Sequence, residues 1–421
     1  MIQLCLFDLD QTLVDTDDMK ELREAGKHRA DGGYADEVRA AFRSRDRALI
    51  SSLALNLVRL NDLNLRFGIF TRSPRRYVDV VLAEAYQNMP WAVVVAYEDV
   101  ERYKPNGQGI IRAMKAVGMR NVSELQHVLM VGDGDMDIRA AYHAGCRVAL
   151  YKPGWPRSYQ RTHWRSLDLL PDTVIDEPED ILAVVHNPDA GLPDLEHLLA
   201  NEGQGAAEPR FDDIAKFYPN NRARQAVHVA GRYFVHCDSL GRRRAWHRLT
   251  QSIQDNKEST EFPQEWVETI RRFIAYHYRM ITTMPIFGGN APELVITAIP
   301  ARPGRVHRLG HLIGQLHASY GGNPRLNRLQ LSFDPNVLGY RPGVQSHSHE
   351  HLNQEQRMAN VRDHLVVANP AAILGKKILV IDDVTTTGAT LLYAKKYMLE
   401  AGARTVDCFS IAQTISDPLR Y

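Results

Sequence analysis

The chain has 421 residues, of which 44% are hydrophobic and 24% are charged, which is the composition of an ordinary folded protein rather than a disordered one. This length exceeds what a single hydrophobic core usually serves, so we expect two domains. The formal net charge of +1 gives no general reason to expect nucleic acid or a membrane surface as a partner.

The cysteines and the N-terminus favour a cytoplasmic protein. The four cysteines are scattered without a C-x-x-C pair, so neither a disulfide framework nor a zinc site is signalled. The apolar start of the chain meets Asp8 after too few residues for a signal peptide. No run approaches the roughly 20 apolar residues that a membrane-spanning helix needs. We therefore expect a cytoplasmic protein without a membrane partner.

The first predicted strand, residues 2–7, ends in two carboxylates. Strand alternation points Asp8 and Asp10 to the same side. Two carboxylates on the same side of a strand end can bind a hard cation such as Mg²⁺, and a carboxylate can attack phosphorus as a nucleophile. This strand end is therefore a candidate site of phosphate chemistry.

Further polar groups follow along the same half of the chain. The predicted strand 66–70 ends at Thr71, and Lys104 follows in a Tyr-Lys-Pro sequence. The predicted strand 127–132 precedes Asp133, Asp135 and Asp137 and a helix over 138–145. These acids mimic the opening of a calcium-binding EF-hand loop, but Ile138 stands where that loop requires glycine, which excludes it.

This ordered set resembles the haloacid dehalogenase (HAD) superfamily of phosphohydrolases, over residues 1 to about 188. The resemblance implies that Asp8 is the nucleophile, which forms an aspartyl-phosphate, and that Asp10 is the general acid. Gln11 replaces the glycine of the usual D-x-D-G-T motif, and its side chain is expected to point away from the two acids. The resemblance assigns phosphoryl binding to Thr71 and Lys104, and Mg²⁺ binding to Asp8, Asp10 (through its carbonyl), Asp133 and Asp137.

Residues 16–64 are predicted to form a small cap. This stretch is rich in Arg, Glu and Ala, and its helical periodicity runs from 36 to 60. In the HAD superfamily an insertion at this place forms a helical cap that closes over the substrate and excludes water. Its basic residues either face an anionic substrate or form a solvated face, and we favour the solvated face for Arg39, Arg43, Arg45 and Arg47.

The middle of the chain contains a predicted linker and a basic segment. Residues 189–210 are acidic and rich in Pro, Gly and Ala, partly helical near 194–200, and would join a first domain (1–188) to a second (211–421). Residues 222–248 interleave arginines with aromatic residues. This segment is predicted to be a β-hairpin turning at 239–241 with an Arg-rich edge. The alternative is nucleic-acid binding through Arg242–Arg244.

Residues 378–391 carry the clearest signature of a sugar-phosphate ligand. An apolar run typical of a buried parallel strand ends in Asp382 and Asp383, and a Thr/Gly turn then leads into a helix over 391–401. The unpaired backbone N–H groups at the start of that helix favour an anion. Two adjacent carboxylates can accept hydrogen bonds from a vicinal diol, such as the 2′- and 3′-hydroxyls of a ribose.

This segment resembles the phosphoribosyl-diphosphate (PRPP) motif of type I phosphoribosyltransferases. The resemblance implies that Asp382 and Asp383 hold the ribose hydroxyls, and that a loop after the predicted strand 293–300 binds pyrophosphate. The residues implied for the 5′-phosphate are Thr385, Thr386, Thr387, Gly388, Ala389 and Thr390, and those for the pyrophosphate loop are Ala301, Arg302 and Arg305.

A polar loop between these two segments resembles one branch of the family. The spacing of Gln354, Arg357 and Asn360 is similar to the hood loop of the competence-protein F (ComF)-like branch, whose cysteine-rich zinc element is absent here. The same loop contains His347, His349 and His351. We interpret these histidines as solvated rather than as metal ligands, because no acid–histidine spacing supports zinc.

The two resemblances imply an α/β protein with two doubly wound domains: a HAD Rossmann-like domain with a small helical cap, and a type I phosphoribosyltransferase domain. The implied function is a bifunctional enzyme that combines an Mg²⁺-dependent phosphatase, acting on a sugar phosphate or nucleotide, with PRPP-dependent phosphoribosyl transfer. One alternative is a phosphatase regulated by a non-catalytic domain that senses PRPP or a nucleotide. Another is a phosphatase that processes nucleic-acid ends. An oligomer is compatible with the sequence.

Overall fold

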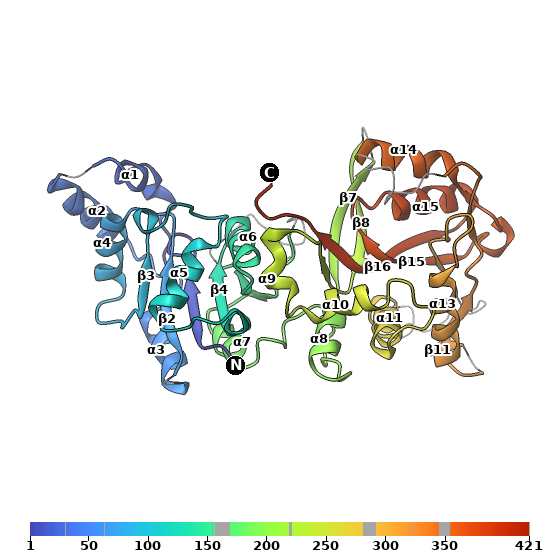
Figure 1. Ribbon diagram of the computed structural model, residues 1–421, viewed down its shortest axis with the longest axis horizontal. Helices are drawn as coiled ribbons and strands as arrows, with labels where there is room; N and C mark the ends of the chain where they lie inside the picture. Colours follow the sequence, from blue (N-terminus) through green and yellow to red (C-terminus); the bar gives the residue numbers. More distant parts are fainter. Residues whose placement is uncertain are drawn as a thin grey trace. The chain divides into compact units, whose positions relative to one another are not determined.

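The computed structural model describes residues 1–420 apart from 30, 63, 154, 156–168, 219–220, 281–291, 323 and 345–353. The chain divides into two compact units (Figure 1). The first comprises Met1–Leu192, Phe234–His247 and Ser416–Tyr421, and the second comprises Pro193–Tyr233 and Arg248–Ile415. The histidines at 347, 349 and 351 lie outside the described residues.

The first unit is built on a six-stranded parallel sheet with the strand order β3-β2-β1-β4-β5-β6. All residues of its central strands are buried, as expected for strands covered on both faces, and these residues are apolar except for Gly132 and Arg147. The predicted α/β fold is confirmed for this unit. The strands are β1 (Leu4–Phe7), β2 (Arg66–Phe70), β3 (Val93–Val95), β4 (Val128–Gly132), β5 (Arg147–Tyr151) and β6 (Thr173–Ile175); the helices that follow them are α4 (Arg75–Ala85), α5 (Gln108–Ala116), α6 (Asp135–Ala144) and α7 (Asp180–His186).

The insertion between β1 and β2 is helical. It contains α1 (Lys20–Ala25), α2 (Gly33–Arg43) and α3 (Ser52–Asn61), and the predicted periodicity is broken where Ser51 caps α3 by accepting a hydrogen bond from the Ala54 amide. The solvated face predicted for its arginines is wrong for Arg47, which is buried and paired with Asp18 at 2.6 Å. Arg39, Arg43 and Arg45 also form ion pairs within the unit, at 2.6–3.2 Å.

The hairpin predicted near residues 239–241 is wrong, because these residues form a short 3-10 turn (Asp238–Leu240) and α9 (Gly241–Arg244). Arg243 is completely buried in the first unit. It pairs with the buried Asp172, donates to the Cys146 carbonyl at 2.6 Å and lies 4.1 Å from the ring centre of Trp246. Arg243 therefore cannot contact a nucleic acid as part of an Arg242–Arg244 patch. Its local sequence looked like an exposed edge because the acid that neutralises it lies 71 residues away.

The second unit contains a mixed eight-stranded sheet with the order β11-β12-β10-β15-β16-β8-β7, and β9 pairs with β16. The five strands from β12 to β8 are parallel, while the edge strands β11 and β7 run antiparallel to their neighbours. The second predicted α/β domain is thus confirmed. Its strands are β7 (Asp212–Tyr218), β8 (Asn221–Val229), β9 (Arg232–Phe234), β10 (Glu293–Ala298), β11 (Arg325–Leu326), β12 (Leu329–Phe333), β15 (Lys377–Thr385) and β16 (Thr405–Ile415), with β13 (Leu338–Tyr340) and β14 (Leu365–Val367) forming a separate antiparallel pair.

Helices accompany this sheet, and one of them falls inside the stretch with linker composition. Asp194 in that helix, α8, is buried and accepts hydrogen bonds from Thr269 at 2.8 Å and Arg272 at 3.0 Å, so α8 packs against α11. The helices are α8 (Asp194–Ala200), α10 (Arg248–Asp255), α11 (Gln264–His277), α13 (Arg308–Ser319), α14 (Gln354–His364) and α15 (Ala389–Glu400). Within the described ranges of the chain, none of the helices has the length and apolar character needed to cross a membrane.

Candidate active sites

The first candidate site lies at the carboxyl edge of the parallel sheet in the first unit. Phe7 in β1 is in register with Ile69 in β2 and with Val131 in β4, so the residues that follow these strands meet at one edge. The Asp8 amide donates to the Val131 carbonyl at 2.8 Å, which fixes the start of this edge. Asp8, Thr71 and Asp133, which the sequence placed at three strand ends, are therefore neighbours in space.

Lys104 stands among three carboxylates of this edge. Its ammonium nitrogen lies 3.0 Å from Asp8 and 2.6 Å from Asp137, and its side chain is 1% exposed. Asp8, Asp133 and Asp137 each offer an oxygen within 4.8 Å of the others. One ammonium cannot neutralise three carboxylates, and an all-oxygen set is what Mg²⁺ prefers. The residues present therefore fit the ion that the sequence predicted.

Burial also perturbs the ionisation of these groups. Burial raises the pKa of Asp8 to about 6, against the opposing attraction of Lys104, and neighbouring Asp137 and Asp10 raise it further. Burial and the charge of Asp137 raise the pKa of Asp133 well above its ordinary value. Burial disfavours the charged form of Lys104, yet Asp137 and Asp8 raise its pKa above the usual value. Such perturbed groups in one cluster are typical of catalytic sites.

Asp10 is held by a separate set of donors. Its carboxylate accepts hydrogen bonds from Thr16 at 2.6 Å, from the Tyr77 hydroxyl at 3.0 Å and from Ser73, and it pairs with Arg23 at 2.9 Å. Sequence reasoning missed Arg23 and Tyr77, because they come from α1 and α4, away from any strand end. The side chain of Asp10 is thus fixed beside the cluster by contacts from the cap insertion and from the helix after β2.

Gln11 occupies the glycine position of the predicted motif with a left-handed backbone. Its φ is +61°, a conformation that side chains other than glycine adopt at some cost. The turn is closed by a hydrogen bond from the Gln11 amide to the Val14 carbonyl at 2.8 Å.

Thr71, the residue directly after β2, is buried at the same edge of the sheet. Its hydroxyl accepts a hydrogen bond from the Ser73 amide at 3.1 Å.

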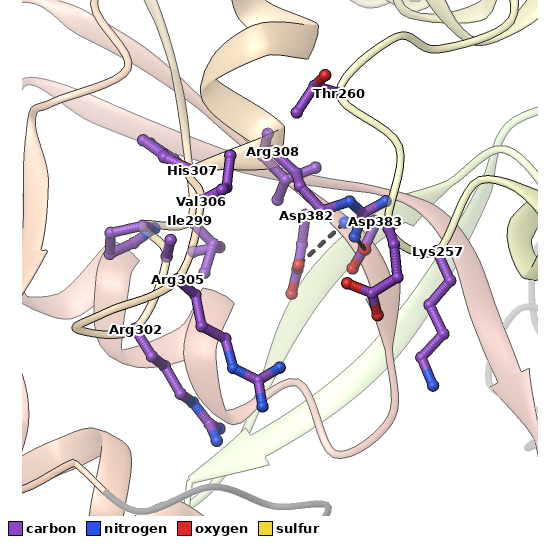
Figure 2. A pocket seen from close by; sticks show the side chains of 14 residues that line it. Lys257, Thr260, Ile299, Arg302, Arg305, Val306, His307, Arg308, Asp382 and Asp383 are labelled. Carbon is purple, nitrogen blue, oxygen red and sulfur yellow. Dashed lines mark hydrogen bonds and ion pairs between the residues drawn. The ribbon is translucent and has the colours of Figure 1, made fainter.

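The second candidate site surrounds Asp382 and Asp383 in the second unit. They line a cavity of about 670 Å³ together with Ala301, Arg302 and Arg305, the three residues of the predicted pyrophosphate loop. Figure 2 shows the side chains of the two arginines on one side of this pocket, with the two acids across from them. Burial, and then the charge of Asp383, raise the pKa of Asp382 well above its ordinary value. The pocket therefore combines the crowded pair Asp382 and Asp383 with the cationic side chains of Arg302 and Arg305.

A smaller cavity of about 100 Å³ adjoins the Thr/Gly turn. It is lined by the turn from Thr385 to Thr390, by Asp382 and by Arg357 of α14. Gly388 has a φ of +77° and begins α15, and a Cβ there would lie 2.7 Å from the side chain of Lys216. Asp382 borders both cavities, so it lies between the predicted places of the 5′-phosphate and the pyrophosphate.

Several residues at this site gave no signal in the sequence. Arg308, at the start of α13, lies 3.5 Å from Asp383 (Figure 2). It also donates to the carbonyls of Asn256 at 2.6 Å and Ser259 at 2.9 Å. It thus ties the segment between α10 and α11 to the acid pair. That segment adds three further residues to the larger cavity, namely Lys257, Glu258 and Thr260.

Two protein families match this chain. Haloacid dehalogenase-like hydrolases match residues 19–151, and the phosphoribosyl transferase domain matches residues 319–420. Asp8 and Asp10 precede the first matched range, and Arg302 and Arg305 precede the second, so the roles of these residues stay predictions.

Curated relatives align with the first match only in part. The chain is 29% identical over 148 residues to a phosphoglycolate phosphatase of Photorhabdus laumondii, which is 35% of this chain and 57% of the relative. It is 27% identical over 129 residues to the pyrophosphatase PpaX of Oceanobacillus iheyensis, covering 31% and 56%. The chain spans about half the length of the curated relatives it matches.

Solved structures also align with part of the chain. A predicted phosphoglycolate phosphatase from Haemophilus somnus aligns with a TM-score of 0.33 at 18% identity, over 44% of this chain and 97% of that one. CbbY from Rhodobacter sphaeroides, in complex with phosphate, aligns with a TM-score of 0.34 at 16% identity, over 43% and 96%.

The fold and the two family matches define a chain that joins a hydrolase domain to a transferase-type domain. The chain contains a haloacid dehalogenase-like hydrolase domain in its N-terminal part and a phosphoribosyltransferase domain in its C-terminal part, as predicted.

Proposed function

We propose that this protein is a bifunctional enzyme, with an Mg²⁺-dependent phosphatase site around Asp8 and a PRPP-dependent transferase site around Asp382 and Asp383. The observation that carries the proposal is the convergence of Lys104 with Asp8, Asp133 and Asp137 at the carboxyl edge of one sheet. The transferase half is supported by the acid pair that borders two cavities, one beside each predicted phosphate-binding element.

In the phosphatase site, Asp8 attacks the phosphorus of a sugar phosphate or nucleotide and forms an aspartyl-phosphate. Asp10, oriented by Tyr77 and Arg23, gives a proton to the leaving oxygen and then takes one from the attacking water. Lys104 and Thr71 stabilise the charge on the transferring group. Asp8, Asp133 and Asp137, with the Asp10 carbonyl, would hold Mg²⁺, which supplies charge neutralisation when bound.

In the transferase site, Asp382 and Asp383 accept hydrogen bonds from the ribose hydroxyls of PRPP. The N–H groups and hydroxyls of residues 385–390 bind the 5′-phosphate at the start of α15, where the helix dipole favours an anion. Arg302 and Arg305 bind the pyrophosphate from the far side of the larger cavity. An acceptor nucleophile then displaces pyrophosphate from the ribose carbon.

Paired variants of the full-length protein test the two halves. Asp8→Asn is expected to abolish phosphate release from a panel of sugar phosphates and nucleotides while leaving PRPP binding unchanged. Asp382→Asn is expected to weaken PRPP binding while leaving phosphatase activity unchanged. Persistent absence of phosphatase activity in the wild-type protein with Mg²⁺ across the panel would overturn the first half. Absence of pyrophosphate release with PRPP across a wide panel of acceptors would overturn the second.

One observation favours a second candidate, in which the C-terminal domain senses PRPP or a nucleotide without consuming it. Arg308 pairs with Asp383 and anchors the segment that carries Lys257 and Glu258 into the cavity. A ligand diol that competes for Asp383 would release this anchor and could report occupancy. This candidate predicts that PRPP changes the phosphatase rate, that the change depends on Arg308, and that PRPP is recovered intact.

A further inference from the structure

A second cluster of ligand-type side chains lies in the second unit, remote in sequence from the acids of either candidate active site. His228 in β8, His277 at the end of α11 and Asp407 in β16 each offer a ligand atom, and these atoms lie within 4.8 Å of one another. The two imidazole ring centres are 4.5 Å apart, and His277 Nε2 lies 3.6 Å from an Asp407 oxygen. Three elements far apart in the chain therefore bring their donor atoms close together.

The cluster lies on a different face of the sheet from Asp382. Asp407 is in register with Leu379 of β15, while Asp382 is in register with Ser410 of β16. Because side chains alternate along a strand, Asp407 and Phe409 point to one face, and Ser410 and Asp382 point to the other. The Phe273 ring of α11 packs 4.5 Å from Phe409, so α11 covers the face that carries the cluster.

Two further side chains, Asp213 and Tyr278, form hydrogen bonds to members of this cluster and orient them. Asp213 is the cross-strand neighbour of His228 in β7, and its carboxylate bonds to His228 Nδ1, which leaves Nε2 for another partner. The Tyr278 hydroxyl donates to Asp407 at 2.8 Å. Metal-binding histidines typically have such a carboxylate on the second ring nitrogen, which fixes the tautomer and strengthens the ligand.

Charge and accessibility also suit a divalent cation. A histidine is neutral when it binds a metal, so the carboxylates of Asp407 and Asp213 would supply two negative charges, which match one divalent ion. The side chains of His228, His277 and Asp407 are 13%, 29% and 29% exposed, so an ion can reach them from solvent. Phe273 stacks on the His277 ring at 4.9 Å and gives the cluster an apolar wall.

We propose that His228, His277 and Asp407 bind a divalent transition-metal ion, with Zn²⁺ as the best-fitting occupant. Imidazole nitrogen and carboxylate oxygen bind Zn²⁺ at roughly 2.0–2.2 Å, so a tetrahedral site requires ligand atoms about 3.4 Å apart. His277 Nε2 and the Asp407 oxygen, 3.6 Å apart, are already close to that spacing. The ion would join β8, α11 and β16, with a fourth position open to water. This proposal does not rest on either catalytic activity.

Binding of the metal alone to the full-length protein tests this. Metal-stripped protein is titrated with Zn²⁺ by calorimetry and with Co²⁺ by visible absorption, and its melting temperature is followed. Apart from any ion held by Asp8, Asp133 and Asp137, we expect one saturable equivalent that raises the melting temperature and that survives Asp8→Asn. A double His228→Gln, His277→Gln variant should lose this equivalent, whereas the control His311→Gln, on an exposed face of α13, should keep it.

A milder variant covers the case in which the double variant does not fold. Asp213→Asn retains all three ligands but removes the carboxylate from His228, and it should weaken Zn²⁺ binding roughly 10- to 100-fold. The proposal is overturned if folded wild-type protein binds no Zn²⁺, or if Asp213→Asn leaves the affinity for Zn²⁺ unchanged. It is equally overturned if substitution of His347, His349 and His351 removes the binding instead.

Discussion

The ammonium group of Lys104 lies 3.0 Å from the carboxylate of Asp8, in a position that is almost closed to solvent. The same group lies 2.6 Å from Asp137, so a single buried cation holds together two of the acids that we assign to catalysis and metal binding. Removal of this cation would leave carboxylates buried without compensation, which is more costly than loss of a surface charge.

Lys104→Met is therefore expected to lower both activity and stability. We expect the free energy of unfolding of the metal-free first unit to fall by about 3–5 kcal/mol, as for other broken buried ion pairs. We also expect phosphatase kcat to fall at least about 100-fold, because the transferring phosphoryl group loses a fixed cation. Calorimetric unfolding and steady-state kinetics measure the two effects. Lys115→Met, at an exposed position of α5, serves as the matched control and should change neither quantity.

Mg²⁺ binding is expected to depend on pH through Asp8. The pKa of Asp8 is raised to about 6 in the metal-free protein, so its ionised form is disfavoured in the folded state. Metal-free protein should thus lose stability as pH rises from about 4 towards 6, since the ordinary pKa of Asp is about 3.9. Mg²⁺ requires the deprotonated carboxylate, so its affinity should rise over the same range with release of protons. Calorimetric titration in buffers of different ionisation enthalpy measures the Mg²⁺ affinity and the number of protons released. An affinity that does not change with pH would contradict the assignment of Asp8 as an Mg²⁺ ligand.

Arg243→Met is expected to destabilise the first unit by about 3–5 kcal/mol, because Asp172 would remain buried without its partner. Arg242→Met, one residue away and exposed, should change the unfolding free energy by less than about 0.5 kcal/mol. The double variant Arg243→Met, Asp172→Asn should recover part of the loss, since no unpaired charge remains. If thermal unfolding gives the same loss of stability for both single arginine substitutions, the buried Arg243–Asp172 pair stabilises the protein no more than an exposed arginine does.

Gly388→Ala is expected to weaken PRPP binding. Its φ of +77° costs other residues roughly 1–2 kcal/mol, and the new Cβ would press against Lys216, whose ammonium group bonds to the Thr386 carbonyl at 2.6 Å. The turn that we propose binds the 5′-phosphate would therefore shift. Binding is measured by calorimetry. The control is Gly314→Ala, within α13 and with open space around it, which should leave binding unchanged and stabilise the helix by about 0.5–1 kcal/mol.

Local sequence patterns predicted most of the architecture. The strands β1 and β4 are buried runs of apolar residues that end beside Asp8 and at Gly132, and β15 contains the apolar run 378–381, so their type and place could be read directly. The segment around α9 could not be read in this way. Its arginines and aromatics alternate as in an exposed hairpin, and only packing against Asp172 and Trp246 makes Arg243 a core residue.

The candidate sites were predictable where a polar group directly follows a strand. Asp8, Thr71 and Asp133 belong to this class, because parallel strands bring their carboxyl ends to one edge. Asp382 lies within β15, directly after its apolar run. Arg23, Tyr77 and Arg308 were not predictable, since each comes from a helix and reaches its acid across the fold.

The sequence by itself determined that this protein has two α/β domains, and where along the chain the groups proposed to bind phosphate lie. Both properties depend on short-range order: apolar runs form strands, and the few residues after each strand occupy its end. Only the tertiary structure decided which charges neutralise which acids and that His228, His277 and Asp407 meet. Ion pairs and ligand clusters join residues tens to hundreds of positions apart, and a side chain acquires such partners only when the packed elements bring them together.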